Sequence, residues 1–291
     1  MMDLVRLWTM RARQTALLSA LILPAICCVA PTAALAEPKD PVEAQSDELP
    51  ARVTAVYRIK FGLLGDIGWF KFTSKLEGGD YKLTAQAKVD TAVFDYVGKM
   101  SSNGEVESSA TKPADYRFHY KQQAAFGKKK DRSLAMVFDR TGVKKIRFMP
   151  PDPPSKKAIP VTEDDLKGAL DPLSGVMALS LGDLSDPCSR KLPIFDGKQR
   201  FDLVFNSAKS GPRGAPQVCN VRLLPISGHK KGKGADSVIS GKIEVELAPV
   251  HKANIVVPKK VTVPTIIGAA ELTTERIEII MPNKQRFALK Q

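Results

Sequence analysis

Apolar and polar side chains alternate over most of this chain, and that alternation most constrains what it can fold into. From Arg52 to Phe61, every odd-numbered position is apolar and most even-numbered positions are polar. The same period of two returns at residues 69–76, 81–89 and 116–121. Successive side chains of a strand point to opposite faces of a sheet, so this pattern is typical of half-buried strands. The chain is therefore predicted to be all-β, with one apolar and one polar face to each strand.

Turn sequences divide the pattern into about a dozen predicted strands. Glu77-Gly-Gly-Asp80 and Asn103-Gly104 are each predicted to be hairpin turns, and Pro113 is predicted to interrupt the chain between strands. Near the end, residues 253–257 and 260–263 are predicted to be two strands separated by Pro258. A sheet of this many antiparallel strands curls instead of staying flat. We expect a long antiparallel curled sheet, either a β-spiral or an open barrel.

One segment, residues 172–181, has the sequence of a helix. Asp171 is a good N-cap, and Pro172 suits the first helical position. The segment is apolar nearly all round, and helices of that kind are buried. It is therefore predicted to lie against the concave face of the sheet.

The first 36 residues have the three parts of a secretory signal peptide. They carry three arginines, then an apolar run at about residues 16–30, then Ala34-Leu35-Ala36 as a small-x-small cleavage site. Cys27 follows Ile26, which does not suit a lipoprotein anchor. We predict export to the periplasm with cleavage after Ala36, no transmembrane anchor in the remaining chain, a flexible leader at 37–50, and a single β-rich domain at 51–291.

Two cysteines remain after that cleavage, Cys188 and Cys219. Exported proteins meet an oxidising compartment, so a disulfide between them is predicted. Two buried free thiols are the alternative. The closed loop would have about 30 residues, for which chain entropy predicts a stabilisation of about 3–4 kcal/mol.

The chain is strongly basic, with 44 Lys and Arg against 31 Asp and Glu and a formal net charge of +13. The basic clusters fall mainly in turns and at strand ends. They are interpreted first as a solvated rim that keeps sheet edges from pairing. The alternative is attraction to anionic envelope polymers or lipid headgroups. Nucleic acid is not an expected partner of an exported protein.

No pattern in the sequence predicts catalysis, a cofactor or a metal site. The three histidines, His119, His229 and His251, lack metal-ligand spacing and are predicted to lie on the surface. Asp196-Gly197 is predicted to be a turn, with Arg200 and Asp202 beyond it on the solvent face of a strand; a polar site there is the alternative. Asp171 and Ser174 are explained as a cap and a helix start. The chain is expected not to be an enzyme, and a hydrolase is the least favoured alternative.

Several short motifs, in this order, resemble an uncharacterised bacterial periplasmic family, the domain of unknown function 3108 (DUF3108). They are Tyr57 with Gly62-Leu-Leu-Gly65, Asp171-Pro-Leu-Ser174, Phe195-Asp-Gly197 followed by Arg200-Phe-Asp-Leu203, and Val257-Pro258 with Gly268. The resemblance spans about residues 51–280. It implies an architecture similar to spiral or open-barrel periplasmic proteins, some of which carry lipoproteins or support envelope integrity. It supplies no activity and no catalytic residue.

The functional hypothesis is binding of a hydrophobic or amphiphilic envelope component, such as a lipid or lipoprotein, in the concave face. The candidate apolar residues are Phe70, Phe72, Tyr116, Phe118 and Tyr120. This hypothesis requires that the predicted helix leave part of the hollow open. The alternative is a scaffold that binds proteins or anionic polymers through its outer face. The sequence defines no oligomeric state.

Overall fold

The computed structural model describes residues 48–125, 127–208, 215–230, 242–265 and 268–290. By its internal contacts the chain divides into two units, Met1–Val42 and Glu43–Gln291, and every described residue belongs to the second. The predicted signal peptide, its cleavage site and residues 37–47 of the predicted leader lie outside the described residues. In the remaining leader, Pro50 is buried and Leu49 packs against the core.

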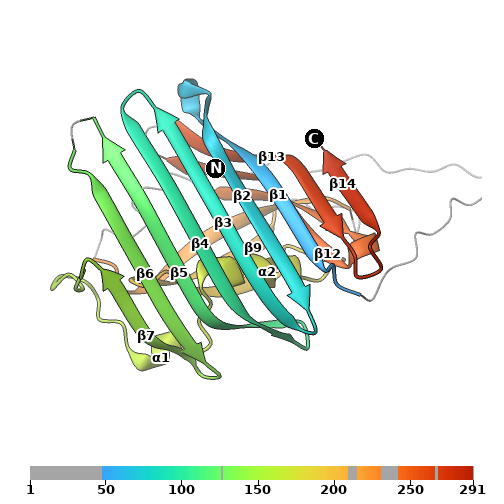
Figure 1. The fold of residues 1–291 in the computed structure, drawn as a ribbon, viewed down its shortest axis with the longest axis horizontal. Helices are drawn as coiled ribbons and strands as arrows, with labels where there is room; N and C mark the ends of the chain where they lie inside the picture. Colours follow the sequence, from blue (N-terminus) through green and yellow to red (C-terminus); the bar gives the residue numbers. More distant parts are fainter. Residues whose placement is uncertain (1–47, 126, 209–214, 231–241, 266–267, 291) are drawn as a thin grey trace, which may run out of the picture. The chain divides into compact units, whose positions relative to one another are not determined.

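A single fourteen-stranded antiparallel sheet forms the described unit (Figure 1). Its strands are β1 (Arg52–Phe61), β2 (Asp66–Glu77), β3 (Asp80–Thr91), β4 (Phe94–Glu107), β5 (Ala110–Ala124), β6 (Lys130–Asp139), β7 (Gly142–Met149), β8 (Arg190–Phe195), β9 (Arg200–Ser207), β10 (Gln217–Ser227), β11 (Ile243–Val250), β12 (Ile255–Thr265), β13 (Gly268–Ile280) and β14 (Arg286–Lys290). The pairing order is β7-β6-β5-β4-β3-β2-β1-β13-β12-β11-β10-β9-β8, and β14 pairs with β13. The path ends at β7 and β8, so the prediction of a curled, unclosed sheet is confirmed.

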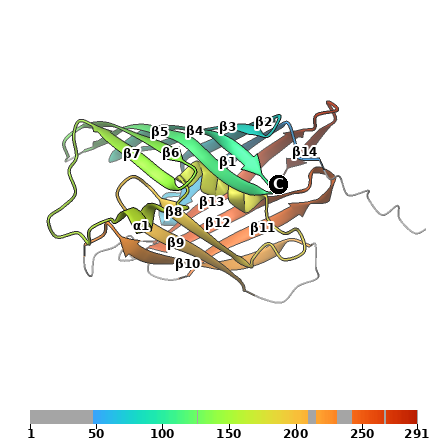
Figure 2. The ribbon, with the colours of Figure 1, turned by 90° about the horizontal axis from the view of Figure 1, so that it is seen from below.

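The sheet folds over the helix α2 (Pro172–Ser180), which lies between its two halves (Figure 2). Strands β3 to β7 lie on one side of the helix and β8 to β11 on the other. The N- and C-terminal parts of the sheet meet where β1 pairs with β13. This places the apolar faces of both halves around one helix.

The predicted buried helix is confirmed, and its ends are fixed by hydrogen bonds. Asp171 accepts hydrogen bonds from the backbone of Leu173 and Ser174, and Pro172 occupies the first turn. At the other end, Arg190 of β8 donates to the carbonyl oxygen of Ala178 at 2.6 Å. The described residues also form three short helices: α1 (Glu163–Leu166), which begins with a capping box at Thr162, η1 (Gly62–Leu64) and η3 (His251–Ala253).

The core has three clusters, and the helix contributes to two of them. Leu173, Met177 and Leu181, the last at the helix C-cap, pack with apolar side chains of β2 to β7. Leu179 packs with side chains of β8 to β12 around the Cys188–Cys219 disulfide. The third cluster covers β1, β12 and β13. The predicted disulfide is therefore present, and it ties the segment after the helix to β10.

Three predicted strand boundaries were wrong for the same reason. Asn103-Gly104 is not a turn but an irregularity inside β4, where the register with β5 shifts. Position 104 requires glycine, because a Cβ there would lie 2.1 Å from the carbonyl oxygen of Lys112. Pro113 pairs opposite it within β5. Likewise, β12 runs continuously through Pro258, beside a register shift with β11.

Candidate functional site

A buried polar cluster fixes the helix to the inner face, the face of the sheet that contacts α2. Asp171 Oδ2 accepts hydrogen bonds from Ser102 Oγ at 2.8 Å and Ser174 Oγ at 2.5 Å. The hydroxyl groups of Tyr81 and Ser174 are 2.8 Å apart. The cluster therefore links the first turn of α2 to β3 and β4.

This cluster is a structural anchor. Asp171, Ser102 and Ser174 are 0 % exposed, and Tyr81 is 2 % exposed, so no substrate reaches them from solvent. Burial raises the pKa of Asp171, while the hydrogen bonds from Ser174, Ser102 and the helix backbone oppose that shift. The interpretation of Asp171 as a cap is confirmed, with the additional contacts to the sheet that the sequence did not reveal.

The helix covers the inner face unevenly along the strands. Cross-strand pairs place Ser74, Leu83, Ser102, Tyr116 and Met136 in one row, and all five are buried. This row lies under the helix, because Ser102 contacts its first turn. Rows closer to η1 become steadily more exposed, as the five predicted aromatic residues show.

All five residues of the predicted apolar face point to the inner face. Tyr116 is buried in the row under the helix, and Phe72 is buried in the next row. Phe118 shares the row of Phe72 but is only half-buried, as are Phe70 and Tyr120 one row further on. Phe72 and Tyr116 therefore belong to the core, while Phe70, Phe118 and Tyr120 remain accessible.

These accessible rings join a wider half-buried apolar surface. Tyr120 stacks on Phe118 and on Tyr96, with ring centroids 5.3 and 5.9 Å apart. The surface continues through cross-strand partners to β13 and β12. We call it the open half of the inner face, and it comprises Ile59, Phe70, Val89, Tyr96, Phe118, Tyr120, Val261, Val263 and Leu272.

The predicted turn at Asp196-Gly197 is confirmed, but the expected exposure of Arg200 and Asp202 was wrong. Asp202 is 3 % exposed and forms ion pairs with Arg200 at 2.6 Å and Lys191 at 2.8 Å. Burial favours a raised pKa for Asp202, but the hydrogen bonds from Lys191 and Arg200 outweigh it and lower that pKa. Arg200 also donates to the carbonyl oxygen of Asp165, so α1 covers this part of the sheet. The short α1 helix was not predicted.

The three histidines lie apart from the buried cluster. His119 is on the outer face, where its Nε2 lies 2.7 Å from Asp131 Oδ1. His229 is half-buried rather than on the surface, because its backbone carbonyl accepts from Ile159 and holds the 150–160 segment against it. His251 begins η3 and is also half-buried. In the described ranges, no group of three or more His, Cys, Asp and Glu side chains is placed to hold a metal ion.

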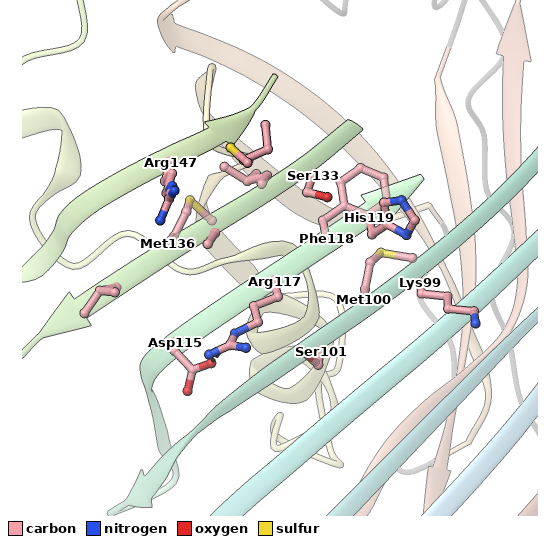
Figure 3. A pocket seen from close by; sticks show the side chains of 14 residues that line it. Lys99, Met100, Ser101, Asp115, Arg117, Phe118, His119, Ser133, Met136 and Arg147 are labelled. Atoms are coloured by element: carbon pink, nitrogen blue, oxygen red, sulfur yellow. Dashed lines mark ion pairs between the residues drawn. The ribbon is translucent and has the colours of Figure 1, made fainter. Parts of the chain in front are cut away.

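A groove of about 750 Å³ crosses the outer face over β4 to β7 (Figure 3). Basic groups from three strands line it: Lys99 of β4, Arg117 and His119 of β5, and Arg147 of β7. One carboxylate, Asp115, also lines it and lies 3.8 Å from Arg117. The alternation pattern predicted that Arg117 and His119 point outward, but only the strand register places Lys99 and Arg147 in the same groove. Exposed Val137 and Met149 add apolar surface.

A family model, "Protein of unknown function (DUF3108)", matches residues 56–212. The chain belongs to this family. The match is shorter than the predicted span, and the motifs at Val257-Pro258 and Gly268 lie outside it. No curated protein matches the chain.

Among solved structures, the chain is similar to a beta-barrel-like protein of domain of unknown function DUF1849 from Brucella abortus. The two share 12 % identity with a TM-score of 0.41, over 79 % of this chain and 98 % of that one. In the part of the DUF3108 chain that the structure describes, no helix is long and apolar enough to cross a membrane.

Proposed function

We propose that this DUF3108 protein is a non-enzymatic periplasmic protein that binds a hydrophobic or amphiphilic envelope component in the open half of the inner face. The observation that carries this proposal is the position of α2. The helix covers the rows of Tyr116 and, in part, Phe72, and it leaves Phe70, Phe118 and Tyr120 half-exposed. Exposed apolar surface of this kind, on a concave face, typically marks a binding site.

The proposed ligand has an acyl or similarly flexible apolar part. The open half is made of aromatic rings and branched aliphatic side chains, which stabilise such a group by removing it from water. Tyr96 and Tyr120 add phenol groups, and burial raises the pKa of Tyr96, so its hydroxyl stays protonated at neutral pH. Phenol groups of this kind can donate hydrogen bonds to a ligand ester or amide.

Periplasmic location is part of the proposal and is supported by the N-terminal sequence and by the Cys188–Cys219 disulfide. Disulfides persist in oxidising compartments such as the periplasm. N-terminal analysis of the protein recovered from a bacterial culture tests cleavage after Ala36.

The binding test uses a substitution whose large side chain fills the open half and leaves the rest of the molecule unchanged. Ala87 lies on the inner face between Phe70 and Gly98, and its neighbour Gln86 is exposed on the outer face. Delipidated protein is titrated with a fluorescent fatty-acyl probe. We expect saturable uptake, at least about tenfold weaker for Ala87→Trp and unchanged for Gln86→Trp. Absence of uptake by the unaltered protein, or equal loss in both variants, would contradict the proposal.

A second candidate function is binding of an anionic envelope polymer or protein through the outer groove of Figure 3. The observation that favours it is that Lys99, Arg117 and Arg147, from three strands, all line this groove. It predicts salt-sensitive retention by cell-wall fractions that is lost in Arg117→Glu with Arg147→Glu and kept in Ala87→Trp.

A further inference from the structure

The turns at one end of the sheet expose large apolar side chains. In the η1 turn between β1 and β2, Leu63 is fully exposed and Leu64 is 65 % exposed. In the turn between β3 and β4, Val93 is 58 % exposed. These are the most exposed large apolar residues of the described chain. Leu63 and Leu64 add little to the core, and exposed apolar side chains that are grouped together typically mark an interaction site.

The turns lie together along the upper end of the sheet in Figure 1. Consecutive antiparallel strands bring them there, and one hydrogen bond joins two of them. Ala125, after β5, donates a backbone hydrogen bond to the carbonyl oxygen of Val93 at 2.9 Å. We call Leu63, Leu64 and Val93 the apolar tips. The open half of the inner face begins at this same end, since its residues are the inner-face rows nearest to η1.

Lysines surround the apolar tips. Lys128, Lys129 and Lys130 follow β5 and are exposed, and no ion pair involving them occurs among the described residues. The three turns and adjoining strand ends, residues 60–66, 88–95 and 121–131, carry six lysines against four aspartates. Of those aspartates, Asp66, Asp90 and Asp131 are already paired with basic groups: Asp66 with Arg58, Asp90 with Lys88, and Asp131 with Lys121. The free charge at this end is therefore positive.

We infer that this end of the sheet docks reversibly on an anionic lipid membrane. Leucine and valine side chains insert among the acyl chains, while lysines at the headgroup level bind anionic phosphates. The inference rests on the proposed function in one respect: docking would place the open half of the inner face against the source or destination of its ligand. A protein partner fits less well, because the apolar tips project from separate turns and form no continuous flat surface.

The test measures flotation of the recovered protein with vesicles of phosphatidylcholine alone or with three-tenths phosphatidylglycerol. The N-terminus is identified in every sample, so each variant is compared at the same chain length. We expect binding to the anionic vesicles that weakens at least about fivefold in Leu63→Ser with Leu64→Ser. The matched control, Leu224→Ser with Ile226→Ser, changes two exposed apolar residues of the outer face of β10 and should bind normally.

A charge-reversal variant tests the electrostatic contribution to vesicle binding separately. Lys128→Glu with Lys129→Glu and Lys130→Glu should abolish the preference for anionic vesicles. Its control reverses three exposed lysines of the outer face, Lys71, Lys75 and Lys82, and should keep most of that preference. Failure of the unaltered protein to float, or equal losses in the test and control variants, would overturn the inference.

The docking and binding results can be told apart. Uptake of the acyl probe is measured in solution without vesicles, where the apolar-tip variants should behave as the unaltered protein. Uptake without flotation would overturn docking and leave the proposed function standing. Flotation without uptake would overturn the proposed function and leave docking standing.

Discussion

At the scale of single residues, Asp171 determines where the helix lies. Its Oδ1 accepts two backbone hydrogen bonds at the helix start, and its Oδ2 accepts hydroxyl hydrogen bonds from Ser102 and Ser174. One carboxylate thus caps the helix and fixes it to β4. The sequence predicts the cap, because Asp before Pro is a local signal. The contact with Ser102 depends on the register of β4, and Ser102 is 69 residues earlier in the sequence than Asp171.

Asp171→Asn should reveal the raised pKa of this buried carboxyl. At neutral pH we expect a loss of about 1–3 kcal/mol in the free energy of unfolding, since the amide replaces an acceptor with a donor. Because burial raises the pKa of Asp171 in the folded state, its contribution is full below the unfolded pKa and is lost as pH rises through the folded pKa. The stability difference between the unaltered protein and Asp171→Asn should therefore grow between pH 7 and pH 4, measured by urea unfolding.

Asp139 provides a control of opposite sign. It is exposed at the end of β6, and hydrogen bonds from Thr141 lower its pKa to about 2. Its contribution is present above the unfolded pKa and is lost as pH falls towards the folded pKa. The effect of Asp139→Asn should shrink as the solution becomes acidic. Parallel pH trends in the two variants would contradict the assignment of a raised pKa to Asp171.

At the scale of elements, the segment after α2 is held by the Cys188–Cys219 disulfide and by Arg190. The cysteines are 31 residues apart in sequence and are both fully buried. Arg190, two residues after Cys188, donates to the end of the helix. The bridge therefore holds the strand that caps α2 as well as β10.

Cys188→Ser should lower the thermal stability much more in oxidising than in reducing buffer. The expected loss in oxidising buffer is about 3–4 kcal/mol, from the entropy of the loop released in the unfolded chain. In reducing buffer the unaltered protein lacks the same constraint, so the difference should become small. The measurement is thermal unfolding by circular dichroism in both buffers, and equal losses in the two would mean that the bridge does not form.

The elements also show what the sequence could and could not predict. The alternation of apolar and polar side chains predicted both ends of β1 as the structure has them. It also predicted that Phe70, Phe118 and Tyr120 point to the inner face. It gave wrong boundaries at Asn103-Gly104 and Pro258, because turn-forming residues also occur at strand irregularities. Local signals do not distinguish a turn from a bulge, since that depends on the neighbouring strand.

At the scale of the whole molecule, one strand pair joins the two halves of the sheet. β1 and β13 pair across more than 200 residues of sequence, with Ala55 opposite Ile277 and Val53 opposite Ile279. The sequence predicts a curled sheet but not this pairing, so it could not show that the N-terminal strand lies at the centre of the order. The uneven coverage by α2, which leaves the open half exposed, follows from the same long-range arrangement.

This topology predicts that the two halves unfold together. Ile277 is 1 % exposed at the junction, whereas Ile146 is 38 % exposed on the edge strand β7. Ile277→Ala should cost about 3 kcal/mol, and Ile146→Ala much less, because only the first leaves a buried cavity. Loss of the Ile277 side chain removes contacts that both halves share. Hydrogen exchange should therefore accelerate by the same factor in β3 to β5 and in β9 to β11. Faster exchange in one half alone would show that the halves are separate cooperative units joined by β1 and β13.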